Sequence, residues 1–202
     1  MKESPPQYQF HPLTPQRWDD FETLFGPRGA CGGCWCMYWR LSRSQFETMK
    51  GSGNRQAIKE LVEAGEMPGL LAYAGEQAVG WCALAPREAY PVLERSRVLQ
   101  RVDDQPVWSV VCFFTAKPFR RKGLTVHLLR AAVEYAAGHG ARLVEGYPVE
   151  PKPKDGVDQP AVPAPFAYTG LASVFRQAGF VEVLRRSETR PIMRYNLREG
   201  SI

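Results

Sequence analysis

The chain lacks a long hydrophobic run. No apolar stretch approaches the roughly 20 residues that span a bilayer, and residues 1–6 (Met-Lys-Glu-Ser-Pro-Pro) lack the apolar core of a signal peptide. A dense Lys/Arg stripe interleaved with aromatic residues is also missing, although the formal net charge is +5. The sequence therefore predicts a cytoplasmic protein that binds neither a membrane nor nucleic acid.

Cysteine is present, but without the spacing of a complete metal site. Five cysteines, an odd number, are thiols or ligands rather than disulfides in a reducing compartment. Three form a Cys-x-x-Cys-x-Cys run at residues 31–36, whereas structural zinc takes four ligands, usually in two separated pairs. His11, Cys82 or Cys112 would complete a set only through the fold, and the last two lie on predicted strands, where core packing is simpler. We expect no metal; bound zinc, a redox disulfide and apolar packing stay open as roles for this run.

The size and composition indicate one domain. The chain has 202 residues, 44% of them hydrophobic and 23% charged, which is ordinary for a globular protein. Residues 148–165 hold six prolines and few apolar side chains. We interpret them as a loop rather than a domain linker, because the sequence that follows is too short to fold alone. The prediction is a single domain over residues 1–202, with its core at about 8–197.

Hydrophobic periodicity predicts an alternation of strands and helices. Helix start signals occur at Thr14-Pro15, at Ser44 with Glu47 in capping-box spacing, at Asn54, and at Thr169. Glycines 26, 65, 138 and 179 mark helix ends. Strands are expected at residues 8–13, 70–74, 79–84, 107–115, 142–149, 180–184 and 192–197.

The strand at residues 107–115 is expected near the centre of a sheet. It is a nearly continuous run of β-branched and aromatic residues, typical of a strand buried on both faces. It runs through a turn into a helix from Leu124, and another strand follows at 142–149. This order is a βαβ unit, so the two strands should be parallel.

The turn of this unit has the chemistry of an anion site. Its sequence is Arg120-Arg-Lys-Gly-Leu-Thr125. A helix N-terminus exposes unpaired N–H groups and a partial positive charge, and a glycine lets an anion approach the backbone. Three adjacent basic side chains would strengthen a pyrophosphate site here. A plain surface turn with solvated charges is the alternative interpretation.

At this turn the sequence resembles the GNAT acetyltransferase superfamily. The family signature is Gln/Arg-x-x-Gly-x-Gly/Ala, and this chain has Arg120, Gly123 and Thr125 at those places, threonine being a departure. Residues 175–180 resemble the family's aromatic-x-x-x-Gly-Phe close. Residues 80–86, together with residues 145–148, resemble a bacterial branch that carries a cysteine-rich loop near its N-terminus.

The resemblance implies a fold and a co-substrate. The fold would be α/β, a central mixed sheet flanked by helices, with the two central strands splayed apart to admit acetyl-CoA. Backbone groups of Phe113, Phe114 and Thr115 would pair with the pantetheine arm, and one N–H would polarise the thioester carbonyl. The pyrophosphate would be held at the turn by Arg120, Arg121, Lys122, Gly123, Leu124 and Thr125. An amine of a small molecule or peptide would attack the thioester directly, and homodimers are common in the family.

The proton-transfer groups depart from the family pattern. A central-strand glutamate is common in relatives, but residues 107–115 contain none. Glu145 on the neighbouring strand is the candidate general base, with a salt bridge as the alternative, and Glu88 is a weaker option. The family's usual acid, a tyrosine, is replaced by Phe175. Tyr168 is the candidate acid; Tyr147, water or no acid at all are alternatives.

The cysteine-rich loop borders the acceptor pocket in the resembled family. The acceptor would then contact Trp35, Tyr38, Trp39 and Arg40, unless these residues pack in the core. The sequence predicts an acetyl-CoA-dependent N-acetyltransferase. A CoA-binding sensor without catalysis, and a zinc- or thiol-based interaction protein that uses residues 31–36, are the alternatives.

Overall fold

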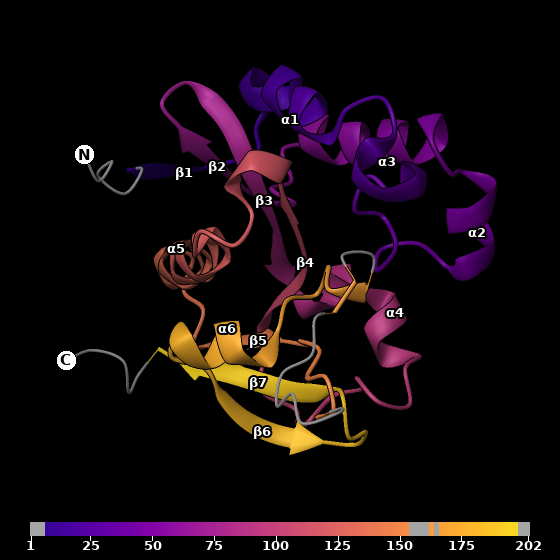
Figure 1. Ribbon diagram of the computed structural model, residues 1–202. Helices are drawn as coiled ribbons and strands as arrows, with labels where there is room; N and C mark the ends of the chain where they lie inside the picture. The colour runs from indigo at the N-terminus through magenta and orange to yellow at the C-terminus, as the bar shows by residue number, and fades with distance from the viewer. Residues whose placement is uncertain (1–6, 154–161, 164–165, 198–202) are drawn as a thin grey trace.

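A seven-stranded mixed sheet forms the centre of the molecule (Figure 1). The computed structural model describes residues 7–153, 162–163 and 166–197. The strand order is β1-β2-β3-β4-β5-β7-β6, and every neighbouring pair is antiparallel except β4 and β5. The strands are β1 (Tyr8–Pro12), β2 (Gly69–Ala74), β3 (Gln77–Pro86), β4 (Trp108–Thr115), β5 (Leu143–Gly146), β6 (Val181–Arg185) and β7 (Pro191–Asn196). The parallel βαβ unit expected from the sequence is confirmed.

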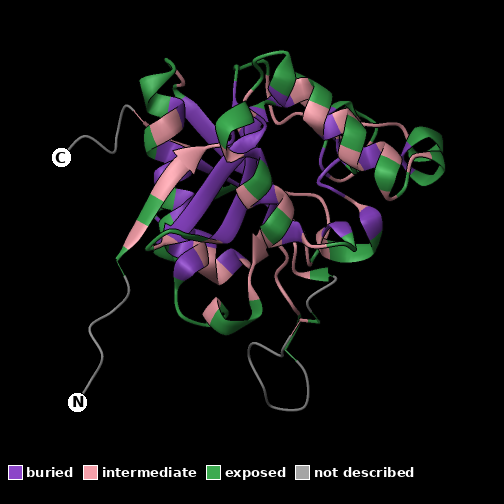
Figure 2. Ribbon diagram, turned by 90° about the horizontal axis from the view of Figure 1, so that it is seen from above, coloured by how far each residue is buried: buried purple, intermediate pink, exposed green. Residues whose placement is uncertain are grey.

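Helices cover both faces of this sheet (Figures 1 and 2). The α-helices are α1 (Trp18–Phe25), α2 (Arg43–Thr48), α3 (Ser52–Glu63), α4 (Pro91–Glu94), α5 (Leu124–Gly138) and α6 (Ala172–Gln177). One apolar cluster joins α1, α3 and the cysteine-rich loop to the sheet through Phe21, Ile58 and Trp81. A second joins α5 and α6 to the other face through Leu128 and Phe175. The strands between the two clusters are largely buried, as the purple ribbon of Figure 2 shows.

A bulge in β4 changes the direction of its side chains. Ala83 pairs with Cys112 and Leu84 with Val110, so Val111 is an extra residue opposite β3. Val111 and Cys112 consequently both belong to the cluster under α1, while Val110 and Phe113 belong to the cluster under α5. A bulge of this kind bends a strand and redirects the side chains that follow it.

The two central strands pair over only a short length. Trp108, Ser109 and Val110 pair with Val144, Glu145 and Gly146, and the ladder ends there. Beyond it, the Phe113 N–H donates to the carbonyl of Tyr168 at 2.6 Å, and Val149 pairs with Leu171. The segment at residues 167–171 therefore lies where β4 and β5 part, as the splayed-strand prediction requires.

Phe175 packs into the base of this opening. Its side chain is fully buried. A Cβ on Gly146 would stand 2.1 Å from the Phe175 ring, and one on Gly170 would stand 2.7 Å from it. Both glycines are required because the ring occupies the space that their side chains would fill. Phe175, at the aromatic position of the family's aromatic-x-x-x-Gly-Phe motif, therefore has a packing role in this chain.

Three helix starts differ from the sequence prediction. The capping box of α2 is formed by Ser42 and Gln45 rather than by Ser44 and Glu47. Asn54 lies inside α3, which begins at Ser52, and its buried amide donates to the Gly33 carbonyl at 3.1 Å. Thr169 precedes α6 without capping it, since Leu171 is the N-cap.

No helix in the described ranges is long and apolar enough to cross a membrane. The proline-rich segment predicted at 148–165 lies in large part outside the described residues.

Candidate active site

The turn before α5 exposes a row of backbone donors. Arg121 (φ 60°) and Gly123 (φ 78°) are left-handed, and Lys122 between them is not. Alternation of this kind turns successive N–H groups toward one side, forming a concave anion site. Within the described part of the chain, no acceptor pairs with the N–H groups of residues 121–125. The turn therefore presents five free donors at the positive end of a 15-residue helix.

Side chains around the turn hold it against the sheet. Arg120 Nε donates to the Thr115 carbonyl at 2.9 Å, which ties the turn to the end of β4. A Cβ on Gly80 would stand 2.9 Å from Leu124 Cδ2, so this glycine lets the first turn of α5 approach β3 closely. Arg121, Lys122 and Gly123 are exposed. The basic side chains are consequently free to face a ligand that docks on the turn.

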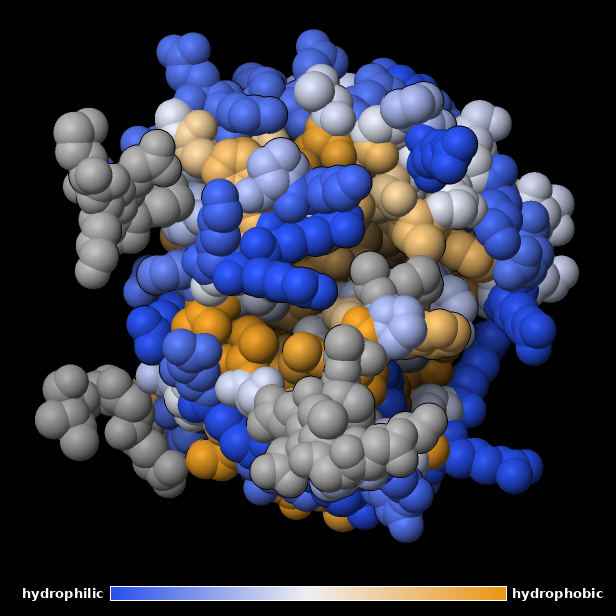
Figure 3. Space-filling model, viewed as in Figure 1, coloured by the Kyte–Doolittle hydropathy of each residue, from blue (hydrophilic) through white to orange (hydrophobic). Residues whose placement is uncertain are grey.

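The surface near this turn is hollowed. Figure 3 shows apolar surface inside the hollow, below a band of hydrophilic side chains, over the region where α5, β4 and α6 meet in Figure 1. A long ligand with a charged end and an apolar arm suits such a surface.

Tyr168 lies where β4 opens. Its carbonyl accepts from Phe113, and its ring packs near Tyr38 (6.3 Å between centroids) and Trp39 (6.5 Å). Burial, reinforced by the nearby Tyr38, raises the pKa of the Tyr168 hydroxyl well above its usual range. The hydroxyl is protonated at neutral pH, as that of an unperturbed tyrosine also is, and so it has a proton to donate.

The four predicted acceptor residues separate into two pairs. Tyr38 and Trp39 contact Tyr168, and Tyr38 is 44% exposed. Trp35 instead stacks on Phe25 in the core, with 5.6 Å between ring centroids. Arg40 lies over the Tyr90 ring at 4.9 Å and pairs with Glu66 at 3.7 Å. The structure thus brings Tyr38 and Trp39 to the opening of β4 and places Trp35 and Arg40 in packing roles.

The cysteine-rich loop packs against β4. Cys36 Sγ lies 3.2 Å from Cys112 Sγ and accepts a hydrogen bond from the Trp81 indole at 3.0 Å. Burial raises the pKa of the Cys36 thiol, and it raises that of Cys34 to about 11. All five cysteines are free, and the described ranges contain no group of three or more metal-ligating side chains.

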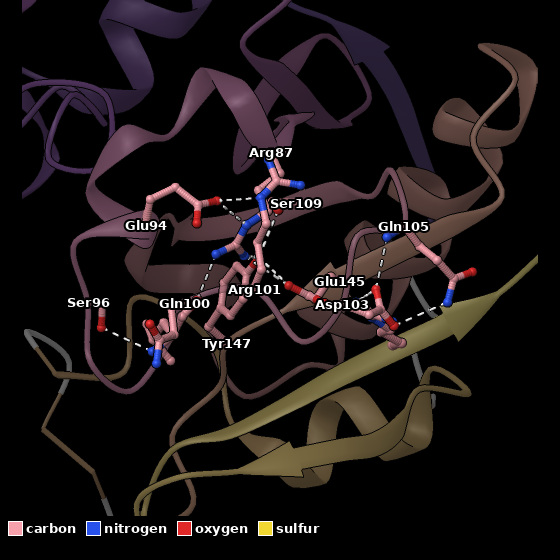
Figure 4. Close-up of polar contacts among 12 residues, drawn as sticks. Arg87, Glu94, Ser96, Gln100, Arg101, Asp103, Gln105, Ser109, Glu145 and Tyr147 are labelled. Carbon is pink, nitrogen blue, oxygen red and sulfur yellow. Dashed lines mark hydrogen bonds and ion pairs between the residues drawn. The ribbon is translucent and has the colours of Figure 1, made fainter.

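Glu145 belongs to a buried polar network rather than to the opening (Figure 4). Its Oε1 accepts from Arg87 at 3.0 Å and from the Tyr147 hydroxyl at 2.7 Å, and its Oε2 accepts from Arg194 at 2.7 Å. Only 1% of Glu145 and 1% of Arg87 is exposed. Both carboxylate oxygens are therefore occupied by charged or hydroxyl donors.

The network extends to the loop between α4 and β4. Arg194 makes a bidentate pair with Asp103, at 2.6 and 3.0 Å. Arg87 Nε donates to Glu94 at 2.7 Å and its Nη2 donates to the Leu99 carbonyl at 2.8 Å. Buried charges are stable only when they are paired in this way. The network joins the end of β3 to β5, β7 and the loop.

Comparison with known proteins now decides the family. A family model described as "Acetyltransferase (GNAT) family" matches residues 35–149, more than half of the chain. The chain belongs to the GNAT acetyltransferase family. No curated protein matches it. As a GNAT member it is an acetyltransferase with acetyl-CoA as co-substrate.

Solved structures share this fold at low sequence identity. A GNAT-family acetyltransferase from Listeria monocytogenes has a TM-score of 0.55 at 8% identity, covering 94% of this chain and 95% of that one. One from Streptococcus agalactiae has a TM-score of 0.54 at 12% identity, with the same coverages. A putative arylalkylamine N-acetyltransferase 7 from the mosquito Aedes aegypti has a TM-score of 0.54 at 12% identity, covering 94% of this chain and 87% of that one.

Sequence reasoning missed the polar network around Glu145. Arg87, Asp103 and Arg194 come from three separate segments, and no local pattern links them. One signal was present: Arg194 interrupts the apolar run of β7, and a charge at such a position needs a buried partner. In this GNAT protein that partner is Glu145.

Proposed function

We propose that the chain transfers the acetyl group of acetyl-CoA to a primary amine by direct attack, without an acyl-enzyme. The observation that carries the proposal is the position of Tyr168. It joins the strand expected to hold the thioester, through Phe113, to the aromatic pair Tyr38 and Trp39. A proton donor between a cofactor strand and a side-chain pocket is the arrangement that amide formation from a thioester needs.

In this proposal, the turn before α5 binds the pyrophosphate of acetyl-CoA. The N–H groups of residues 121–125 would hold the pyrophosphate, assisted by Arg120, Arg121 and Lys122. The pantetheine arm would run along β4 at residues 113–115. Because the Phe113 N–H is occupied by the Tyr168 carbonyl, we assign the polarisation of the thioester carbonyl to a backbone N–H of residues 114–115.

The chemical step then uses few groups of the protein. The neutral amine attacks the carbonyl carbon, a C–N bond forms and the C–S bond breaks. The departing thiolate takes the proton of the Tyr168 hydroxyl, the nitrogen loses its extra proton to water, and water returns a proton to Tyr168. Glu145, with both oxygens engaged, acts in this proposal by holding β5 rather than as the base.

Acetyl-CoA titration and thiol release test the proposal. Acetyl-CoA should bind in a calorimeter, and an amine panel should release free CoA thiol. An Arg121→Glu/Lys122→Glu pair should abolish binding, because it places two carboxylates on the phosphate site. The matched control is Arg95→Glu/Arg97→Glu, the same charge change on two exposed residues outside the turn. Equal binding by both double variants would refute the assignment of the turn.

A CoA sensor without catalysis is the second candidate. Two observations favour it: Phe175 fills the packing position where relatives carry a tyrosine, and Glu145 is fully engaged. Acetyl-CoA binding with no thiol release on any amine would select the sensor. Failure to bind acetyl-CoA at all would leave the interaction protein based on residues 31–36.

A further inference from the structure

Arg190 stands beside the aromatic residues at the opening of β4. It is the last residue before β7. Its Nη1 donates to the Thr169 hydroxyl at 3.1 Å, and Thr169 is fully buried next to Tyr168 in the chain. The pKa of its guanidinium responds to both Tyr168 and Tyr38, so these two side chains lie close to it. The cation therefore faces the same side chains that surround the proposed acceptor pocket.

This cation has no carboxylate partner among the described residues. Two acidic side chains of this region are engaged elsewhere. Glu188 pairs with Lys152, and Glu150, whose N–H donates to the Thr189 carbonyl, pairs with Arg176 and Arg185. Burial lowers the pKa of the Arg190 guanidinium, the direction expected for a charge that lacks compensation. A half-buried arginine that donates one N–H to a neutral hydroxyl has most of its other N–H groups available for a ligand.

A second free donor belongs to the same group of side chains. The indole N–H of Trp39 is buried, and no acceptor for it exists among the described residues. Trp39 packs near the Tyr168 ring. Buried donors are nearly always paired in folded proteins. The indole N–H has no acceptor and the guanidinium has no carboxylate partner among the described residues, and both groups lie close to residues 168–169. They are suited to an acceptor-only group that enters the proposed pocket.

We propose that Arg190, assisted by the Trp39 indole N–H, binds a carboxylate of the acceptor, so that the acceptor is an amino carboxylate rather than a simple amine or a polyamine. The inference rests on the proposed amine acetylation. A carboxylate matches the planar donor fork of a guanidinium. Tyr38 and Tyr168 would pack on the side chain of the amino carboxylate, so aromatic amino acids fit best.

Matched pairs of acceptors test the inference directly. Each pair has the same amine with and without the carboxylate: phenylalanine and phenethylamine, tyrosine and tyramine, lysine and cadaverine. Thiol release with acetyl-CoA gives kcat/KM for each compound. The wild-type protein should prefer the carboxylate member by about 10–100-fold, the usual range for a charge-assisted hydrogen-bonded pair. Phosphoethanolamine against ethanolamine tests phosphate, and a preference confined to that pair would overturn the carboxylate assignment.

Variants of Arg190 assign the preference to this residue. Arg190→Gln keeps a donor for Thr169 but removes the charge, and it should reduce kcat/KM for the carboxylate member to that of its partner. Arg190→Lys keeps the charge but loses the fork, and it should retain part of the preference. Lys152→Gln removes an equal charge from an exposed residue paired with Glu188, and the full preference should remain. Calorimetric titration should show unchanged acetyl-CoA affinity in all three.

Two results would overturn the inference: equal rates for both members of every pair in the wild-type protein, or an Arg190→Gln loss that is the same for both members. If acetyl-CoA binds but no amine releases thiol, the proposed transfer fails. Arg190 is then judged by equilibrium binding of the same pairs with CoA present, followed through tryptophan fluorescence. Carboxylate-selective binding lost in Arg190→Gln supports the inference, and its absence refutes it.

Discussion

Tyr168 is held both by its backbone and by its ring. Its carbonyl accepts the Phe113 N–H on the central strand, while its ring packs near Tyr38 and Trp39. The backbone contact fixes the height of the residue along β4, and the ring contacts fix the direction of the hydroxyl. Contacts on two sides hold this residue in place, as the proposed proton transfer from its hydroxyl would require.

Removing the Tyr168 hydroxyl should affect turnover and spare binding. Tyr168→Phe keeps the ring packing and the backbone contact, so acetyl-CoA affinity should stay unchanged. Loss of a general acid typically lowers the rate by about 10²–10⁴-fold, and kcat measured by thiol release should fall within that range. Tyr135→Phe is the control, since Tyr135 stacks on His139 of the α5 C-terminus. Unchanged turnover in Tyr168→Phe would rule out the role.

At the scale of the helix, the start of α5 depends on a left-handed residue. Gly123 is its N-cap at φ 78°, and a Cβ there would meet nothing within 4 Å. An alanine would be strained without a clash, at a cost of roughly 1–2 kcal/mol. The added methyl group would also reduce the space at the turn where we propose that the phosphate approaches the backbone.

Gly123→Ala should therefore lose both stability and acetyl-CoA affinity. Gly75→Ala is a matched control, because Gly75 (φ 60°) also has open space around it and lies in the β2–β3 turn. Thermal unfolding should show similar losses in both variants, and calorimetry should show weaker acetyl-CoA binding only in Gly123→Ala. Equal affinities would mean that the phosphate does not dock on this turn.

At the scale of the strands, Glu145 connects β5 to β7 and to the end of β3. Glu145→Gln leaves two buried arginines with one charge fewer between them, which should lower the free energy of unfolding by about 3–5 kcal/mol. Urea unfolding measures this loss. Glu88→Gln is the control, since Glu88 pairs with Arg101 at the surface, and such pairs contribute about 1 kcal/mol or less.

The Glu145→Gln variant also distinguishes a structural role of Glu145 from a role as general base. If Glu145 holds the strands, the folded fraction of Glu145→Gln should keep kcat and its pH profile. A general base would reveal itself through a lower kcat and loss of the acidic limb of that profile.

At the scale of the whole molecule, local sequence patterns predicted the strands of the sheet but not the contacts between distant segments that join them. The strand at 107–115 and the turn at 120–125 are continuous in the chain, so composition and glycine placement were enough to find them. The Tyr168 contact with Phe113 joins residues 55 positions apart in the chain, and Glu145 meets Arg87 58 positions away. Such contacts leave no periodic signal. Ser42 with Gln45 and Ser44 with Glu47 both have capping-box spacing, and the helix uses Ser42.

The acid stability of the molecule should depend on the network that crosses the sheet. The hydrogen-bonded pair with Arg194 lowers the pKa of Asp103 from 3.8 to about 2. Asp103 is thus more acidic in the folded state than in the unfolded chain. The unfolded chain binds more protons between these values, so the contribution of Asp103 is complete above about pH 4 and is lost as the pH falls toward 2.

Asp103→Asn should flatten the pH dependence of stability in that window. Unfolding free energies from urea titrations at intervals between pH 5 and pH 2 measure the effect. The wild-type protein should lose stability more steeply below about pH 4 than the variant, and the two should differ most at neutral pH, where the pair with Arg194 is fully charged. Asp104→Asn removes an exposed neighbouring carboxylate and should follow the wild-type curve. Parallel curves for Asp103→Asn and the wild-type protein would mean that Arg194 is held by Glu145 alone.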